Sequence, residues 1–213
     1  MSSEASDVRH ILKQIRHDIQ HKAAQIAGSF SPVPALITWS RFLAAGLLVF
    51  IVYGSADPKA VFWIILAGAF SDYLDGWLAR RIRGNTYPGK VMDFTADKLF
   101  LSVALITVAF RLGGLDTLVA SLLTAYHLLL LFTLSVISWS VHVPVVTITT
   151  GERLAVLFSF LLLITATGRI AFPHKQIFDS LYTPLMMIAL LSALTGLLSY
   201  LRLLRRILAR ILE

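Results

Sequence analysis

The chain of 213 residues contains no cysteine, and only 15% of its residues are charged. The absence of cysteine excludes disulfides and thiolate metal sites. The shortage of charge accompanies 57% hydrophobic residues and a mean hydropathy of +0.76. A soluble domain is about 45–50% apolar and about 25% charged, so this composition argues against an ordinary soluble protein and against intrinsic disorder. It is typical of a single helical membrane bundle.

Six segments of the sequence approach the roughly 20 mostly apolar residues that a membrane-spanning helix needs. They are Leu36–Tyr53, Ala60–Arg80, Val91–Leu112, Thr117–Ser138, Gly151–Ala171 and Leu181–Leu201. Proline and glycine mark the connections between them, and Pro32 and Pro34 lie just before the first. We therefore expect an all-α fold in which residues 32–213 form a six-helix transmembrane bundle.

Residues 1–31 have a different pattern, in which apolar residues from Val8 to Ile19 recur at helical spacing with basic residues between them. This pattern predicts an amphipathic helix that lies on the membrane surface. The alternative is a helix outside the membrane that packs on its own protein. Because the first residues are polar, we expect no cleaved signal peptide.

The basic residues indicate the orientation of the bundle. Six spans put both ends on one side, where thirteen lysines and arginines then fall, against four on the other side. Cytoplasmic loops are enriched in Lys and Arg, so we expect both ends in the cytoplasm and the chain in the cell (inner) membrane. The net charge of +7 then reflects cytoplasmic loops and anionic headgroups. Nucleic acid is not an expected partner, because the basic residues are scattered among apolar spans.

Four acidic residues lie in or beside the apolar segments, where an aspartate costs roughly 2.5–3.5 kcal/mol to insert. Asp72 and Asp75 share one face of the second predicted helix, and Asp93 and Asp97 share one face of the third. A short turn at Gly84-Asn85 allows the two helices to run antiparallel, with the acid pairs facing each other near the cytoplasmic end. Four carboxylates favour a hard cation such as Mg²⁺, Mn²⁺ or Ca²⁺.

Two other interpretations of the acids stay open: a salt-bridge cluster with Arg80, Arg81 and Lys98, and an ion pathway in a transporter. Small residues near the acids favour a ligand site. Gly76 and Ala79 leave room beside the helix backbone, and Arg80 could hold phosphate oxygens. We expect Gly68, in contrast, to serve close packing between helices.

Together these residues form the pattern D-x2-D-G-x2-A-R-x8-G-x3-D-x3-D. Its fixed positions are Asp72, Asp75, Gly76, Ala79, Arg80, Gly89, Asp93 and Asp97. The pattern resembles the signature of the CDP-alcohol phosphotransferase family, and all eight fixed positions match. The predicted spans and surface helix are also similar to that family, so the resemblance extends over nearly the whole chain.

The resemblance implies a homodimeric membrane enzyme that displaces CMP from a CDP-linked alcohol at a cytoplasmic site. It implies divalent metal, Mg²⁺ or Mn²⁺, in two sites held by Asp72, Asp75, Asp93 and Asp97, with Asp97 also matching the general base. Gly76, Ala79 and Gly89 match positions that make room for the cytidine nucleotide, and Arg80 matches a phosphate contact. Two divalent ions can neutralise a diphosphate, and a base within reach of the acceptor hydroxyl can take its proton.

The run from Pro34 to Arg41 is similar to the Pro-Asn-x-Leu-Thr-x-x-Arg opening of the first span in many members, with Ala35 in place of Asn. Thr38 and Arg41 are therefore candidate nucleotide or phosphate contacts. The alternative for Arg41 is that its side chain extends to the membrane interface.

The stretch from Gly89 to Lys98 is similar to phosphatidylglycerophosphate synthases and eukaryote-type cardiolipin synthases, although Phe94 replaces a proline. Lys98 could attract an anionic acceptor or balance Asp97. Gly151-Glu152-Arg153-Leu154 is similar to members that use inositol phosphate, and Arg153 suits either phosphorylated acceptor. His127 could contact the acceptor too, or simply be hydrogen-bonded inside the bundle.

The sequence thus predicts a phosphatidyltransferase that moves the phosphatidyl group of CDP-diacylglycerol to a phosphorylated polyol, first sn-glycerol 3-phosphate, among membrane lipids. Inositol phosphate and phosphatidylglycerol are the alternative acceptors, and an ether-lipid donor is also open. The rivals from other classes are an ion-coupled transporter and an inactive protein that only binds CDP-lipid.

Overall fold

The computed structural model describes residues 32–54, 57–81, 87–113, 115–141 and 149–212. Over these ranges the chain forms helices and no strand, so the all-α prediction is confirmed for them. The helices are α2 (Pro32–Tyr53), α3 (Pro58–Arg81), α4 (Tyr87–Phe110), α5 (Thr117–Val141), α6 (Thr150–Ala171) and α7 (Gln176–Leu212). The predicted surface helix of residues 1–31 and the predicted turn at Gly84-Asn85 lie outside the described residues.

Each predicted span corresponds to one of these helices, and the differences lie at the ends. Pro32 and Pro34 belong to the first turn of α2 rather than preceding the helix, because first-turn N–H groups have no partner within the helix and proline loses nothing there. α7 begins before the predicted Leu181, continues past the predicted Leu201 to Leu212, and contains Pro184. One proline removes a single backbone hydrogen bond, and the continuous apolar pattern keeps the helix intact around it.

Polar side chains define where three of the helices begin. Asp57 accepts a hydrogen bond from the N–H of Lys59 at 3.1 Å, and Pro58 follows it as the first residue of α3. Asp116 accepts bonds from two N–H groups of the first turn of α5, at 2.9 and 3.1 Å. Thr149 caps α6 by accepting from the N–H of Glu152 at 3.2 Å. These caps satisfy N–H groups that have no intrahelical partner.

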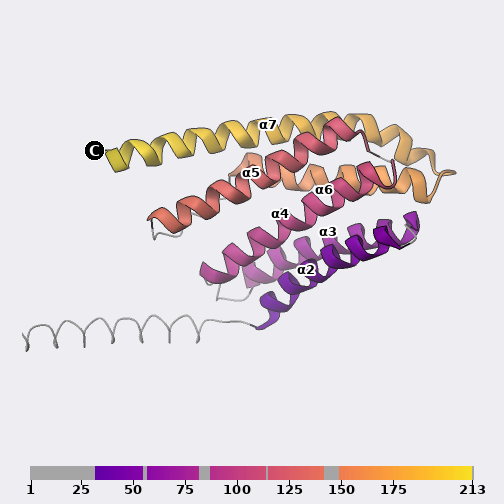
Figure 1. The fold of residues 1–213 in the computed structure, drawn as a ribbon, viewed down its shortest axis with the longest axis horizontal. Helices are drawn as coiled ribbons and strands as arrows, with labels where there is room; N and C mark the ends of the chain where they lie inside the picture. The colour runs from indigo at the N-terminus through magenta and orange to yellow at the C-terminus, as the bar shows by residue number, and fades with distance from the viewer. Residues whose placement is uncertain (1–31, 55–56, 82–86, 114, 142–148, 213) are drawn as a thin grey trace, which may run out of the picture.

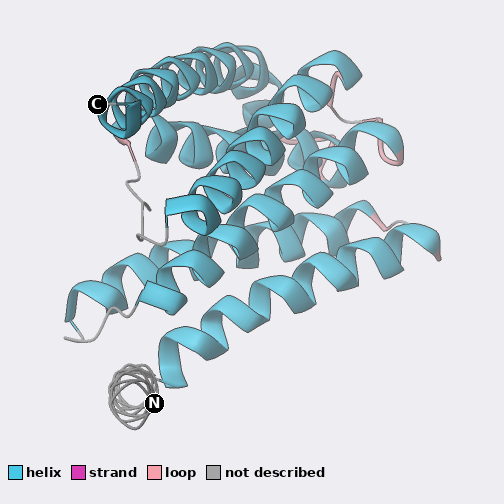
Figure 2. Ribbon diagram, turned by 60° about the vertical axis from the view of Figure 1, so that its left-hand side comes forward, coloured by secondary structure: helices cyan, strands magenta, loops and turns pink. Residues whose placement is uncertain are grey.

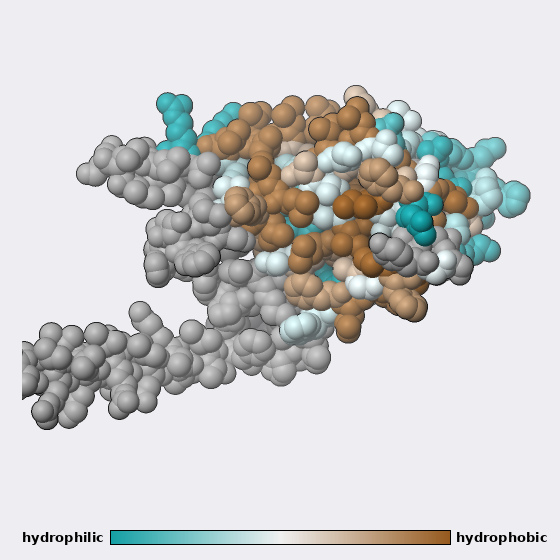
Figure 3. Space-filling view, in the orientation of Figure 1, coloured by the Kyte–Doolittle hydropathy of each residue, from teal (hydrophilic) through white to brown (hydrophobic). Residues whose placement is uncertain are grey.

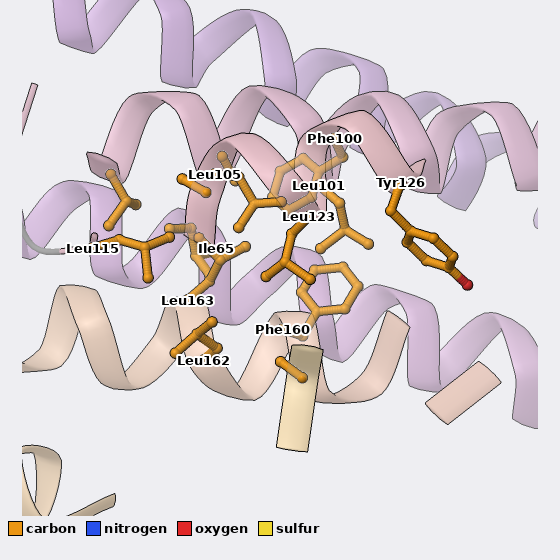
Figure 4. Packing of buried hydrophobic residues seen from close by; sticks show 14 of the residues in the cluster. Ile65, Phe100, Leu101, Leu105, Leu115, Leu123, Tyr126, Phe160, Leu162 and Leu163 are labelled. Carbon is orange, nitrogen blue, oxygen red and sulfur yellow. The ribbon is translucent and has the colours of Figure 1, made fainter. Parts of the chain in front are cut away.

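The helices pack as a bundle in which α2 and α3 lie beside α4 on one side, while α7 runs along α6 on the other (Figures 1 and 2). α5 packs on α4 and α7, and α6 also contacts α3. The core lies between α3, α4, α5 and α6, where Ile65, Leu101, Leu123 and Leu163 are fully buried (Figure 4). This core holds α4 at the centre of the bundle.

The ring of Phe100 on α4 lies directly against Gly68 of α3. A Cβ atom on Gly68 would lie 2.5 Å from ring carbons of Phe100, which is fully buried and stacks on Phe160 at 6.0 Å between ring centroids. The expectation that Gly68 serves close helix packing is therefore confirmed.

The outside of the bundle carries many exposed apolar side chains, and apolar residues cover much of the face in Figure 3. On α2, for example, Leu43 and Phe50 are largely exposed. In the described part of the chain, two helical stretches are long and apolar enough to cross a membrane, Thr150–Ala171 and Gln176–Arg202, and three shorter helical stretches are apolar. A surface of this kind suits lipid, whereas the six-span arrangement remains a prediction.

Candidate functional site

The eight signature positions lie on two helices. Asp72, Asp75, Gly76, Ala79 and Arg80 are in the second half of α3, and Gly89, Asp93 and Asp97 are in the first half of α4. Of these side chains, only that of Asp97 is among the described ones. The roles of the other seven, and of Thr38 on α2, stay predictions.

Asp97 forms an ion pair with Arg41, so α4 is tied to α2 at this point. The Arg41 side chain is fully buried, and that of Asp97 is 15% exposed. Arg41 also donates from Nε to the Ser71 hydroxyl at 3.2 Å, and that hydroxyl donates to the carbonyl oxygen of Gly68 at 2.8 Å. A guanidinium can bond several acceptors in fixed directions, so Arg41 holds α2, α3 and α4 in one arrangement.

This burial excludes the interfacial interpretation of Arg41, and its role as a nucleotide or phosphate contact stays a prediction. An arginine that extends to the interface keeps its charged end in water. The Arg41 side chain instead ends against Asp97 inside the bundle, which contradicts the interfacial alternative. Ser71, directly before Asp72, is a partner that the sequence analysis missed.

The donor set suits a divalent cation. The motif supplies four carboxylates from α3 and α4, and oxygen ligands are those that Mg²⁺ and Mn²⁺ prefer. The described member, Asp97, is paired with Arg41 and is 15% exposed. Among the side chains that the structure describes, no three acidic, histidine or cysteine groups form a metal cluster. The side chains of Asp72, Asp75 and Asp93 are not among those described.

Lys98 does not pair with Asp97, its neighbour in sequence, but with Glu152 of α6. Lys98 Nζ lies 3.0 Å from Glu152 Oε1, and the two side chains are 1% and 3% exposed. The ammonium also lies 5.1 Å from the ring centroid of Phe94. Glu152 is in the first turn of α6, where a negative charge interacts favourably with the helix dipole. Glu152 is a partner of Lys98 that the sequence does not reveal; its one local signal is Thr149-x-x-Glu152, which has the spacing of a capping box.

The two other predicted acceptor contacts differ in exposure. His127 on α5 is fully buried and its Nε2 lies 3.2 Å from the hydroxyl of Ser159 on α6. The expectation of a hydrogen-bonded histidine inside the bundle is therefore confirmed, and acceptor contact stays a prediction. Arg153, at the start of α6, is exposed. Ser159 is a further residue that the sequence analysis did not single out.

The tyrosine beside His127 explains a close helix contact. The Tyr126 hydroxyl points at the backbone of Gly196 on α7, so closely that a Cβ atom there would overlap it. Gly196 also faces Gly151 of α6, where a Cβ atom would lie 3.0 Å from the Gly196 backbone. The start of α6 thus packs tightly on α7, beside the buried pair of Lys98 and Glu152.

Comparisons with known proteins agree with the signature. The sequence profile of the CDP-alcohol phosphatidyltransferases matches residues 32–209. The chain is 32% identical to a CDP-diacylglycerol–glycerol-3-phosphate 3-phosphatidyltransferase of Aquifex aeolicus over 78 residues, which cover 37% of this chain and 43% of that protein. A protein of the same description from Pseudomonas fluorescens is 34% identical over 85 residues, 39% of this chain and 44% of its own length.

A cardiolipin synthase (CMP-forming) of Oryza sativa subsp. japonica is 33% identical over 81 residues, covering 37% of this chain and 25% of the relative. These matches span less than half the length of the curated relatives. The profile, in contrast, covers every described helix from α2 to most of α7. Because the match includes both helices that carry the acids, this chain belongs to the CDP-alcohol phosphatidyltransferase family.

Proposed function

We propose that this protein is a membrane phosphatidyltransferase that uses CDP-diacylglycerol as donor and sn-glycerol 3-phosphate as acceptor, releasing CMP and forming phosphatidylglycerol phosphate. The observation that carries the proposal is the complete eight-residue signature on α3 and α4 within a family match that covers most of the chain. Proteins of this family are associated with membranes and generally depend on divalent metal. The apolar exterior of the bundle agrees with such a location.

The proposed reaction makes one bond and breaks one. The acceptor hydroxyl oxygen attacks the phosphorus that bears the lipid alcohol, and the bond from that phosphorus to the CMP oxygen breaks. Asp97 takes the hydroxyl proton, a contribution of about 10²–10⁴-fold for a positioned base. Its ion pair with Arg41 keeps the carboxylate in place. Asp72, Asp75, Asp93 and Asp97 would hold Mg²⁺ or Mn²⁺, which would neutralise charge on the diphosphate.

The nucleotide and its phosphates would lie along α3. Gly76, Ala79 and Gly89 would leave room for the cytidine, Arg80 would contact phosphate, and Thr38 of α2 would assist. Arg41 would hold Asp97 in place rather than lie against the nucleotide, because its side chain is fully buried and already bonds Ser71.

The three residues proposed to bind the acceptor differ in their exposure to solvent. Arg153 is exposed on the first turn of α6 and could meet the acceptor phosphate directly. Lys98 and His127 are buried, so they would support that contact from inside the bundle rather than meet the acceptor directly. An arginine forms two parallel hydrogen bonds with a phosphate, which suits glycerol 3-phosphate and inositol phosphate alike.

The names of relatives favour glycerol 3-phosphate as the acceptor. The Aquifex aeolicus and Pseudomonas fluorescens proteins are named for transfer to glycerol 3-phosphate. The Oryza sativa relative is named a cardiolipin synthase, which keeps phosphatidylglycerol as the second candidate. Inositol phosphate is the third, on the strength of Glu152-Arg153.

We further propose six membrane spans, with the site and both ends of the bundle on the cytoplasmic side of the inner membrane, and a homodimer. The distribution of basic residues and the apolar exterior support the orientation and the spans.

An acceptor screen tests the proposal. Purified protein is given CDP-diacylglycerol and Mg²⁺ or Mn²⁺ with glycerol 3-phosphate, inositol phosphate, serine or phosphatidylglycerol in turn, and CMP release is measured. We expect metal-dependent CMP release with glycerol 3-phosphate above the other three. Release with another acceptor would correct the substrate, and no release with any acceptor would contradict the enzymatic proposal. Ion uptake into vesicles without cytidine nucleotide would support the transporter instead.

A further inference from the structure

The buried ion pair of Lys98 and Glu152 has no step of its own in the proposed reaction. The two charged atoms lie 3.0 Å apart with the side chains 1% and 3% exposed, whereas the pair of Arg169 and Asp179 at the other end of α6 is 37% and 56% exposed. A buried ion pair is weak evidence for stability, because removing two charges from water can cost more than their attraction returns. Apolar side chains could fill the same space, so the pair calls for a role other than stability.

On α4, Lys98 follows directly after Asp97, the proposed base. Consecutive helical residues point about 100° apart, so Asp97 and Lys98 face different neighbours. Asp97 meets Arg41 of α2, and Lys98 reaches Glu152 of α6. The same turn of α4 is therefore bonded on two sides, and rotation of α4 about its axis would break one bond or the other.

On α6, the other member of the pair, Glu152, lies in the first turn. The N–H of Glu152 donates to the Thr149 hydroxyl, and Gly151 packs so closely on Gly196 that a Cβ atom on Gly151 would lie 3.0 Å from the Gly196 backbone. Arg153 follows directly and is exposed. The pair thus joins the turn that bears the base to the turn that bears the proposed acceptor contact.

We propose that Lys98 and Glu152 form a positioning pair that fixes Arg153 relative to Asp97, so that a phosphorylated acceptor is held with its hydroxyl at the base. This inference rests on the proposed function. A misplacement of about 1 Å between reacting groups can cost about 10²-fold in rate. Loosening the pair should therefore impair use of the acceptor, while the donor, bound through the motif on α3 and α4, is recognised as before.

The first test changes the reach of the pair but keeps both charges. Glu152→Asp shortens the acidic side chain by one methylene, and Lys98→Arg lengthens its cationic partner. We expect Glu152→Asp to lower kcat/KM for the acceptor by about 10–100-fold, with a lower kcat from the misplaced hydroxyl and a higher acceptor KM from the loosened phosphate contact, and with KM for CDP-diacylglycerol unchanged. Adding Lys98→Arg should recover most of the loss, because the longer side chain spans the gap.

The second test removes the charges. The double variant Lys98→Met with Glu152→Leu fills the site with apolar groups of similar volume, a replacement that is often neutral or stabilising for folding. We expect the thermal unfolding midpoint to be retained and the acceptor KM to rise. The matched control is Arg169→Gln with Asp179→Asn, an ion pair at the opposite end of α6, which should leave the kinetics for both substrates unchanged.

The outcomes separate this proposal from the proposed function. Absence of CMP release from the wild-type protein would refute both. With an active wild type, a Glu152→Asp variant with normal kcat and normal acceptor KM, or one whose KM rises equally for donor and acceptor, would overturn the positioning role alone. If the apolar double variant fails to fold, the two charge-conserving variants still decide the question.

Discussion

The contact between Gly68 of α3 and the ring of Phe100 on α4 predicts the effect of adding a single methyl group at Gly68. In Gly68→Ala, the new Cβ atom would lie 2.5 Å from Cε1 and Cζ of Phe100. Carbon atoms in contact prefer about 3.5–4.0 Å, so ring and helix must separate by about 1 Å. Phe100 is fully buried and stacked on Phe160, so the ring has no free space to enter.

The magnitude follows from a matched substitution. Gly46 on α2 is also inside a helix, but a Cβ atom there would have nothing within 4 Å. Both changes gain the helix propensity of alanine over glycine, about 1 kcal/mol, so their difference isolates the overpacking at Phe100. Overpacking a core typically costs about 1–3 kcal/mol. We therefore expect Gly68→Ala to be less stable than Gly46→Ala by about that amount.

The assay is the thermal unfolding midpoint of the purified protein in detergent, together with the rate of CMP release. Phe100 lies less than one turn from Asp97 on α4, so a shift of about 1 Å should also slow turnover by up to about 10²-fold. Replacing Phe100 by leucine in the Gly68→Ala background should recover part of both losses, with a coupling of about 0.5–3 kcal/mol for residues in contact. Equal stability of Gly68→Ala and Gly46→Ala, or no coupling to Phe100, would refute the close approach.

Three further substitutions test the site and its surroundings. Asp97→Asn should lower CMP release by about 10²–10⁴-fold because the amide cannot take the acceptor proton, while nucleotide binding is retained; normal turnover would show that another group is the base. Arg41→Lys keeps the charge but loses the fixed fork that joins Ser71 to Asp97, so kcat should fall with little change in the KM for donor, and an unchanged kcat would argue against the positioning of Asp97 by Arg41. Asp179→Asn removes an exposed ion pair with Arg169 and should change the free energy of unfolding by at most about 1 kcal/mol, as measured by denaturant unfolding; a larger loss would mean that this pair is not the solvated contact described here.

The helices were predictable because hydropathy and helical spacing are local properties of the sequence. Every predicted span corresponds to a helix, and the largest difference is α7, which extends to Leu212. That end was missed because the predicted span stopped where the sequence turned basic after Leu201, although arginine is a good helix former. The capping residues Asp57, Asp116 and Thr149 are also readable from sequence, because each acts within three residues of itself.

The signature residues were predictable because their spacing is fixed along two neighbouring helices, and the family match then covered both. The partners of the charged side chains were not predictable from the sequence. From the sequence, Lys98 could contact the acceptor or balance Asp97, whereas its partner in the structure is Glu152, 54 positions away in a different helix. Which neighbour a helical side chain meets depends on the rotation and register of the two helices, and periodicity along one helix carries no information about either.

By itself, therefore, the sequence determined an all-helical, strongly apolar chain with a cluster of acids and small residues at the spacing of a known signature. Only the tertiary structure decided that Arg41 is buried against Asp97 and that the next residue of α4 is bonded to the first turn of α6. The reason is physical: hydrophobic burial is set by each residue and its near neighbours, whereas an ion pair between helices forms only after packing has fixed both helices in space.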